Sequence, residues 1–279
     1  MFQVKPMIAK DFQFATTMAN TMNWNMATED FEFMVSLEPE GCFVAFQGSE
    51  RIGIATSVSF GKVGWFGNLI IKENYRDKGA GGLLVKHAVK YLQSKGVKSI
   101  GLYAYPNLIK FYGNIGFIPD EDFSVLMVEA LDSLAAETLP KVGPQQIQSI
   151  AEFDSRCFGG NRRKMLESII LGKGNLSCYV TEENEYVGYV VAKTYEKMSE
   201  VGPLICEAGN VDVAISLLKA VLAKLTDLSV YAVLPKKEKV LTNVLFRVGF
   251  REDFYLTRMF LGQPLSKNCI YLAESLERG

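Results

Sequence analysis

The chain has 279 residues, 48% of them hydrophobic, with 30 lysine and arginine against 31 aspartate and glutamate side chains. The length suggests two domains or one large one, and the charge balance, which holds in both halves, excludes the basic excess of a nucleic-acid-binding protein. No apolar run approaches the roughly 20 residues that span a bilayer, and the N-terminal stretch lacks a signal-peptide pattern. We therefore expect a cytoplasmic protein that binds neither nucleic acid nor membrane.

Residues 1–130 alternate between strand-like and helical periods. In chain order the sequence predicts a strand at 4–8, helices at 9–20 and 27–39, a hairpin at 41–60 and an apolar central strand at 64–72. An amphipathic helix that begins in the glycine run at 79–82 is predicted next. It is followed by a strand at 98–105, a short helix at 107–116 and a closing strand at 123–131. The pattern is that of an α/β protein.

A segment with two prolines and a glycine, residues 133–144, predicts a linker between domains at 1–132 and 145–279. The second half repeats the order of the first more loosely. It predicts helices at 145–158 and 162–172, a hairpin at 176–196, a strand at 201–209, a helix at 211–225, a strand at 228–234 and a helix at 239–250. The endings "FYGNIGF" and "LFRVGF" occupy corresponding places, which indicates internal repetition on the scale of a domain.

The cysteines and the single histidine give no sign of a metal site. The five cysteines form no C-x-x-C pair and stand mostly in apolar surroundings, which predicts buried free thiols in a reducing cytosol: Cys42, Cys157, Cys178, Cys206 and Cys269. His87 has no cysteine near it at ligand spacing. It lies off the apolar stripe of its predicted helix, so we expect it to be exposed.

The stretch "YRDKGAGG" places three glycines where a strand turns into a helix. It matches neither the phosphate-binding loop G-x-x-x-x-G-K-S/T nor the dinucleotide motif G-x-G-x-x-G, because Leu84 stands at the last glycine position. Unpaired amides, the helix dipole and the charges of Arg76 and Lys78 would nevertheless meet at one spot, which favours an anion site for a pyrophosphate. A glycine-rich turn without a ligand is the alternative.

The segments "LIIKENYRDKGAGGLLVKHAVKYL" and "LYAYPNLIKFYGNIGF" resemble the two signatures of the GCN5-related N-acetyltransferase (GNAT) superfamily. Arg76, Gly79 and Gly81 meet its pattern R/Q-x-x-G-x-G/A, and the likeness covers about residues 3–130. With "NWNMATEDFEFM" and "FDSRCFGGNRRKML", the whole chain resembles a tandem subgroup whose C-terminal domain is degenerate. The resemblance implies two GNAT-like domains, each a mixed, mostly antiparallel sheet flanked by helices.

The resemblance also implies acetyl-CoA as co-substrate and a set of residues that binds it. Backbone groups at the end of the central strand would meet the pantetheine arm, and the glycine turn would hold the pyrophosphate. Tyr112 takes the place of the general acid that protonates the departing thiolate. The implied cofactor-binding residues are Leu69, Ile70, Ile71, Arg76, Asp77, Lys78, Gly79, Ala80, Gly81, Gly82 and Asn107.

The acceptor side is predicted to lie around "NWNMATED", where Trp24 and Asn25 would contact the substrate. Of the nearby acids Glu29, Asp30 and Glu73, we rank Glu29 first as the base, with capping of the following helix as the alternative role of this acidic pair. Trp24 is equally suited to packing between helix and loop.

The C-terminal half has no arginine-led glycine run, and Glu207 and Asp212 would repel a pyrophosphate at the corresponding place. We expect it to complete the acceptor site and not to bind CoA.

Together these patterns predict an N-acetyltransferase that moves an acetyl group to the primary amine of a small metabolite by direct attack in a ternary complex. A non-catalytic CoA-binding sensor and a protein N-acetyltransferase are the alternatives. The sequence leaves the acceptor's identity and the oligomeric state open.

Overall fold

The computed structural model describes residues 1–131, 137–265 and 268–279. Its N-terminal half contains, in chain order, β1 (Phe2–Pro6), α1 (Phe12–Asn20), α2 (Thr28–Leu37), β2 (Cys42–Gln47), β3 (Glu50–Ser59), β4 (Val63–Ile71), α3 (Ala80–Ser94), β5 (Ser99–Ala104), α4 (Ile109–Gly113) and β6 (Ile118–Val128). These elements agree in type and order with the predicted ones.

The C-terminal half contains α5 (Ile147–Phe158), α6 (Arg163–Ile170), β7 (Leu176–Glu182), β8 (Glu185–Thr194), β9 (Met198–Glu207), α7 (Val211–Leu222), β10 (Ser229–Pro235), α8 (Lys239–Arg247), β11 (Arg251–Leu261) and β12 (Cys269–Leu272). Short 3-10 turns lie at Ala9–Asp11, Glu73–Tyr75, Pro106–Leu108 and Pro144–Gln146. The strands β11 and β12 were not among the predicted elements.

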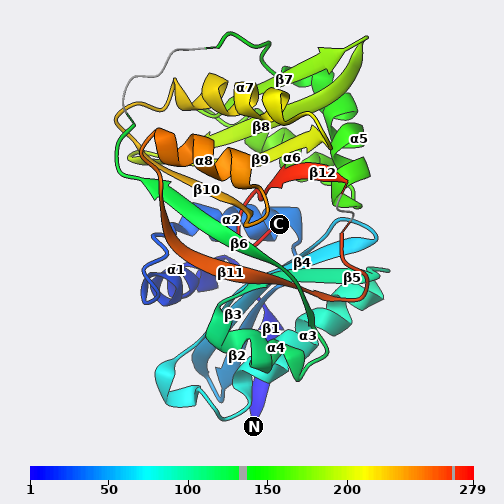
Figure 1. The fold of residues 1–279 in the computed structure, drawn as a ribbon. Helices are drawn as coiled ribbons and strands as arrows, with labels where there is room; N and C mark the ends of the chain where they lie inside the picture. Colours follow the sequence, from blue (N-terminus) through cyan, green and yellow to red (C-terminus); the bar gives the residue numbers. More distant parts are fainter. Residues whose placement is uncertain (132–136, 266–267) are drawn as a thin grey trace.

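The strands form one mixed sheet that runs through both halves, in the order β1-β2-β3-β4-β5-β11-β6-β10-β9-β8-β7, with β12 attached to β9. Neighbours are antiparallel except for the parallel pairs β4–β5 and β9–β10. Figure 1 shows β6 and β11 crossing side by side between the halves. Each half therefore gives one strand to the other, since β11 pairs with β5 and β6 pairs with β10.

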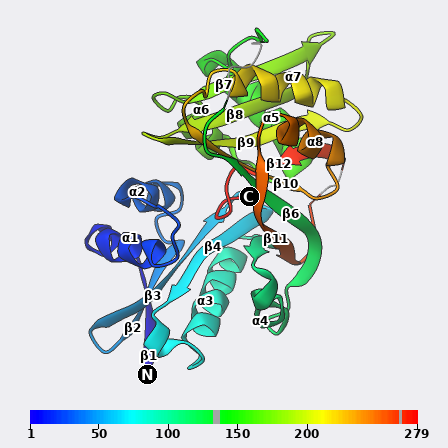
Figure 2. The same cartoon turned by 60° about the vertical axis from the view of Figure 1, so that its left-hand side comes forward.

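Helices cover both faces of the sheet in each half (Figure 2). On one face of the N-terminal sheet, α3 buries its stripe of Leu84, Val85, Ala88 and Leu92, which recur at helical spacing, against Phe66 and Ile71. On the other face, α1 and α2 cover Ile54 and Ile70. A third cluster joins Trp65 to Phe158 of α5, so the apolar core is continuous between the halves.

The predicted linker lies partly outside the described residues, which omit 132–136. The domain ranges 1–132 and 145–279 therefore stay predictions. The exchanged strands add that a cut within this segment would leave β5 without its neighbour β11.

The prediction of five free thiols was wrong for one pair. Cys157, near the end of α5, forms a disulfide with Cys269 at the start of β12, with 5.9 Å between their Cα atoms. The two residues are 112 positions apart in the sequence, so only the tertiary fold brings them together. Cys42, Cys178 and Cys206 are free and buried, as predicted.

The helix lengths and the exposure of the single histidine bear on two further predictions. Within the described ranges, every helix is too short or too polar for a membrane crossing. The cytoplasmic location stays a prediction. His87 is exposed, as expected, and packs edge-to-face on Phe43.

Candidate active site

The strands β4 and β5 run side by side for only a short distance. Residues 63–65 pair with residues 99–101, and the described residues show no pairing between the two strands beyond that point. The remaining part of β4 therefore has one edge that does not pair with β5. Backbone groups along such an edge are available to a ligand, because no neighbouring strand uses them.

A β-bulge changes the direction of the β4 backbone along this unpaired edge. Thr56 of β3 faces Gly67, but Ile54 faces Ile70, so two residues of β4 stand opposite Ala55. Asn68 adopts the left-handed conformation with φ of 50°, and its side chain donates a hydrogen bond to Thr56 Oγ1 over 3.2 Å. Bulges of this kind turn backbone groups out of the ladder and are common beside active sites.

The glycine turn follows β4 directly and ends in the start of α3. Gly79 precedes the helix with φ of 89°, a conformation that favours glycine. The Leu83 amide donates to the Gly79 carbonyl over 3.0 Å, whereas the amides of residues 77–82 have no protein acceptor among the described residues. These amides and the positive end of the helix dipole suit an anion, so the turn stays the candidate anion site.

Side chains around the turn leave this anion site open. A Cβ atom added at Gly82 would meet nothing within 4 Å, and one at Gly81 would stand 3.6 Å from the Phe111 ring. Arg76 Nε donates to the Ile71 carbonyl over 3.1 Å, and Lys78 Nζ donates to the Asn74 carbonyl over 2.8 Å. Both basic groups are thus held beside the turn, and Asp77 is exposed.

Tyr112 lies on the same face of the sheet as α3. It is 5% exposed, and its ring packs edge-to-face against Phe66, Phe111 and Phe117. Burial raises the pKa of Tyr112, so its hydroxyl stays protonated at neutral pH. Asn107 is exposed in the turn that precedes α4.

On the acceptor side, the predicted residues are only partly gathered. Trp24 is half-buried against the α1–α2 core, whereas Asn25 and Glu29 are exposed. Asp30 accepts a hydrogen bond from the Ala27 amide over 2.7 Å and so caps α2. Packing therefore accounts for Trp24 and capping for Asp30, while Glu29 stays a candidate.

Sequence reasoning missed the segment that follows β12, residues 273–279, which we name the inserted segment. It lies between the two halves, against β4 (Figure 2). Trp65 Nε1 donates to the Leu276 carbonyl over 3.2 Å, and a Cβ atom added at Gly67 would stand 2.6 Å from Glu277 Cα. An apolar run at 269–273 was the one local signal for an element here.

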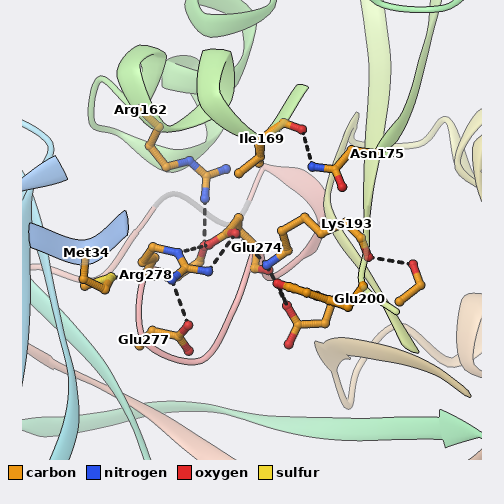
Figure 3. Close-up of polar contacts among 12 residues, drawn as sticks. Met34, Arg162, Ile169, Asn175, Lys193, Glu200, Glu274, Glu277 and Arg278 are labelled. Atoms are coloured by element: carbon orange, nitrogen blue, oxygen red, sulfur yellow. Dashed lines mark hydrogen bonds and ion pairs between the residues drawn. The ribbon is translucent and has the colours of Figure 1, made fainter. Parts of the chain in front are cut away.

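Ion pairs fix the inserted segment in place (Figure 3). Glu274 is fully buried and pairs with Lys193 at 2.7 Å and with Arg278 at 2.8 Å. Burial alone would raise the pKa of Glu274, but these two cations lower it below its usual range. Lys193 also pairs with Glu200 at 2.8 Å, and Arg278 pairs with Glu277 at 2.9 Å.

Further contacts tie the segment to both halves. The Arg278 guanidinium lies 5.2 Å from the ring centre of Phe33 on α2 and contacts Met34 Sδ at 3.5 Å. Arg162, which is buried with Asp154 as its partner, donates to the Gly279 carbonyl over 2.8 Å. The inserted segment is therefore part of the core between the halves.

Comparison with known proteins agrees with this geometry. Residues 8–117 match the model of the acetyltransferase (GNAT) family, and residues 150–272 match that of an acetyltransferase (GNAT) domain. A curated N-acetyltransferase described as uncharacterized, ycf52 of Gracilaria tenuistipitata var. liui, is 33% identical over 69 residues. That match spans 24% of this chain and 37% of the length of the relative.

Solved structures share the fold along the whole chain. A Pyrococcus horikoshii protein has a TM-score of 0.81 at 19% identity, over 100% of this chain and 96% of its own. A tandem GNAT protein from the clavulanic acid biosynthesis pathway, solved without AcCoA, has a TM-score of 0.64 at 13% identity, over 94% and 98%. The chain therefore belongs to the GNAT acetyltransferase family and carries two GNAT domains in tandem.

Proposed function

We propose that this protein is an acetyl-CoA-dependent N-acetyltransferase that acts on a small amine, with its single active site in the N-terminal half. The observation that carries the proposal is the edge of β4 beyond residue 65, which does not pair with β5, followed along the chain by the unpaired amides of residues 77–82. An extended thiol ester with a pyrophosphate at its far end has this combination of a polar arm and a terminal anion.

The residues present fit acetyl-CoA. The amides at the start of α3 suit the pyrophosphate, with Arg76 and Lys78 as nearby positive charges. The free edge of β4 at Leu69, Ile70 and Ile71 suits the amides of the pantetheine arm, and Asn107 stands near the start of α4 as a further candidate. When bound, acetyl-CoA supplies the acetyl group as an activated thioester.

Two groups of the chain would then serve the reaction. Backbone amides at the bulge of β4, around Asn68, would suit the oxygen of a polarised carbonyl. Tyr112 Oη holds a proton at neutral pH because burial raises its pKa, which is the state required of a group that protonates a leaving sulfur.

The acceptor would approach from the face that carries α2, opposite α3 and Tyr112. Trp24, Asn25 and Glu29 are our candidates for this side, with Glu29 as the base that takes a proton from the amine. The C-terminal half, through its inserted segment, would close the same side.

The test is a pair of measurements on the full chain. Isothermal titration with CoA should give about one site per chain. A thiol-release assay with acetyl-CoA should then show turnover with at least one member of a panel of amino acids, polyamines, amino sugars and peptide N-termini. Tight CoA binding with no turnover on any member would favour the non-catalytic sensor, and turnover on peptides alone would favour a protein acetyltransferase.

A further inference from the structure

The inserted segment lies at the mouth of the proposed site, on the face opposite the cofactor side. Phe66 points into the core under α3, whereas its neighbours Trp65 and Gly67 meet residues 276–279. Gly67 immediately precedes the bulge of β4. Any acceptor that reaches the bulge from the α2 side must therefore pass along the inserted segment.

The side chains around the segment carry an excess of negative charge. We name this group the segment cluster; its acids are Asp30, Glu200, Glu274 and Glu277, and its cations are Lys193 and Arg278. Both cations already pair with Glu274, which is completely buried. Four carboxylates thus share two cations, which leaves room for further positive charge.

Glu277 is the member of the segment cluster whose backbone packs on Gly67, next to the bulge. Its side chain is 19% exposed, whereas that of Glu274 is 0% exposed, so a ligand can reach Glu277 but not Glu274. Burial raises the pKa of Glu277 by more than the nearby Arg278 lowers it. The Ser275 hydroxyl is buried and has no hydrogen-bond partner among the described residues, so the segment holds an unsatisfied polar group.

We propose that Glu277 binds the acceptor, and that the acceptor is a small amine with a second positive charge. This inference rests on the proposed function and narrows its substrate class. A cationic group beside Glu277 would gain a charge-assisted hydrogen bond and would offset the excess of carboxylates. An acceptor with its own carboxylate would be repelled by the same acids, because Arg278 and Lys193 are held in ion pairs with Glu274.

Binding of two matched amines tests the proposal without relying on turnover. Putrescine and γ-aminobutyrate have carbon chains of equal length and differ in the far group, which is an ammonium in one and a carboxylate in the other. Isothermal titration of each into the full chain saturated with CoA should show that putrescine binds at least about tenfold more tightly. The full chain is required because β11 completes the N-terminal sheet.

The variant Glu277→Gln keeps the size of the side chain and removes its charge. It should weaken putrescine binding by about tenfold to a hundredfold, the usual range for a hydrogen bond to a charged group, and leave CoA affinity unchanged. Glu129→Gln is the matched control, because Glu129 is 74% exposed and pairs with Arg251 at the surface. Unchanged CoA affinity also shows that the variant is folded.

Two results would overturn the proposal: equal affinity for the two amines, or undiminished putrescine binding in Glu277→Gln. Turnover reports on a different question. If putrescine binds through Glu277 but no amine in the panel is acetylated, the proposed function fails and the binding site stands. If amines are acetylated with no preference for positive charge, the function stands and this inference fails.

Discussion

Each half of the chain contains one pair of parallel strands, β4–β5 in the first and β9–β10 in the second. The two pairs differ in what lies beside them where the pairing ends. In the N-terminal half, β4 and β5 separate after residues 65 and 101, and the rest of β4 keeps an edge that does not pair with β5. In the C-terminal half, β9 and β10 pair at residues 198–201 and 229–232. Farther along β9, β12 pairs with residues 204–207. A strand therefore occupies the place that corresponds to the unpaired edge of β4.

The two halves also differ in the groups that acetyl transfer would need. The turn after β4 offers glycines and unpaired amides, whereas Glu207 ends β9 and Asp212 lies in the first turn of α7. Aligned by their common Gly-Phe ending, Tyr112 of α4 corresponds to Leu245 of α8, which is buried and has no proton to give. In its described residues, the C-terminal half has the fold of the first half without the free strand edge, the arginine-led glycine run and a tyrosine at this position.

The largest expected effect is the loss of CoA binding when the proposed anion site of the N-terminal half is disrupted. Gly81→Glu should abolish CoA binding, because it places bulk and negative charge where the pyrophosphate would meet the α3 amides. The Gly81 position itself has room for a side chain, with its nearest neighbour at 3.6 Å, so the fold should tolerate the change. Isothermal titration with CoA measures the loss.

Lys90→Glu is the control for this variant, since it also introduces a glutamate on α3 but at an exposed position away from the turn. It should leave CoA affinity unchanged. A wild-type stoichiometry of two sites, or residual CoA binding in Gly81→Glu, would mean that the C-terminal half binds CoA despite β12.

The next effect concerns the buried tyrosine. Tyr112→Phe should lower kcat about 100-fold or more, the usual loss when a proton-transfer group is removed, and leave CoA affinity nearly unchanged. Both side chains fill the same space between Phe66, Phe111 and Phe117, so stability should change little. Steady-state kinetics by thiol release measures kcat, and an unchanged value would assign the proton to another group or to water.

The sequence predicted what depends on local pattern. The helical stripe of α3, the hairpin β2–β3 and the glycine turn all follow from spacing within about 20 residues. The candidate cofactor residues were implied by the family resemblance and stay predictions. The exchange of β6 and β11 did not, because strand pairing such as Leu126 with Glu252 joins residues from opposite halves. The Cys157–Cys269 disulfide and the inserted segment were missed for the same reason, since each depends on contacts between distant parts of the chain.

The prediction with the smallest expected effect tests whether one segment packs on a strand of each half. The stretch from β12 to Gly279 pairs with β9 through β12 and then lies against β4, and a glycine allows its close approach at each place. A Cβ atom at Gly202 of β9 would stand 1.9 Å from the Ala273 carbonyl oxygen, and one at Gly67 of β4 would stand 2.6 Å from Glu277 Cα. Both neighbours are backbone atoms and cannot rotate away.

Gly202→Ala and Gly67→Ala should each lower the free energy of unfolding by about 1–3 kcal/mol, the usual cost of overpacking, with the larger loss at Gly202 because its contact is shorter. Urea unfolding measures both. Gly113→Ala is the matched control, since a Cβ atom there meets nothing within 4 Å and alanine favours a helix. Gly67→Ala should also raise the KM for the acceptor and leave CoA affinity unchanged, because it pushes the inserted segment off β4 only on the acceptor side. If neither variant is less stable than Gly113→Ala, the segment does not pack on these strands, and the difference between the two strand pairs must have another cause.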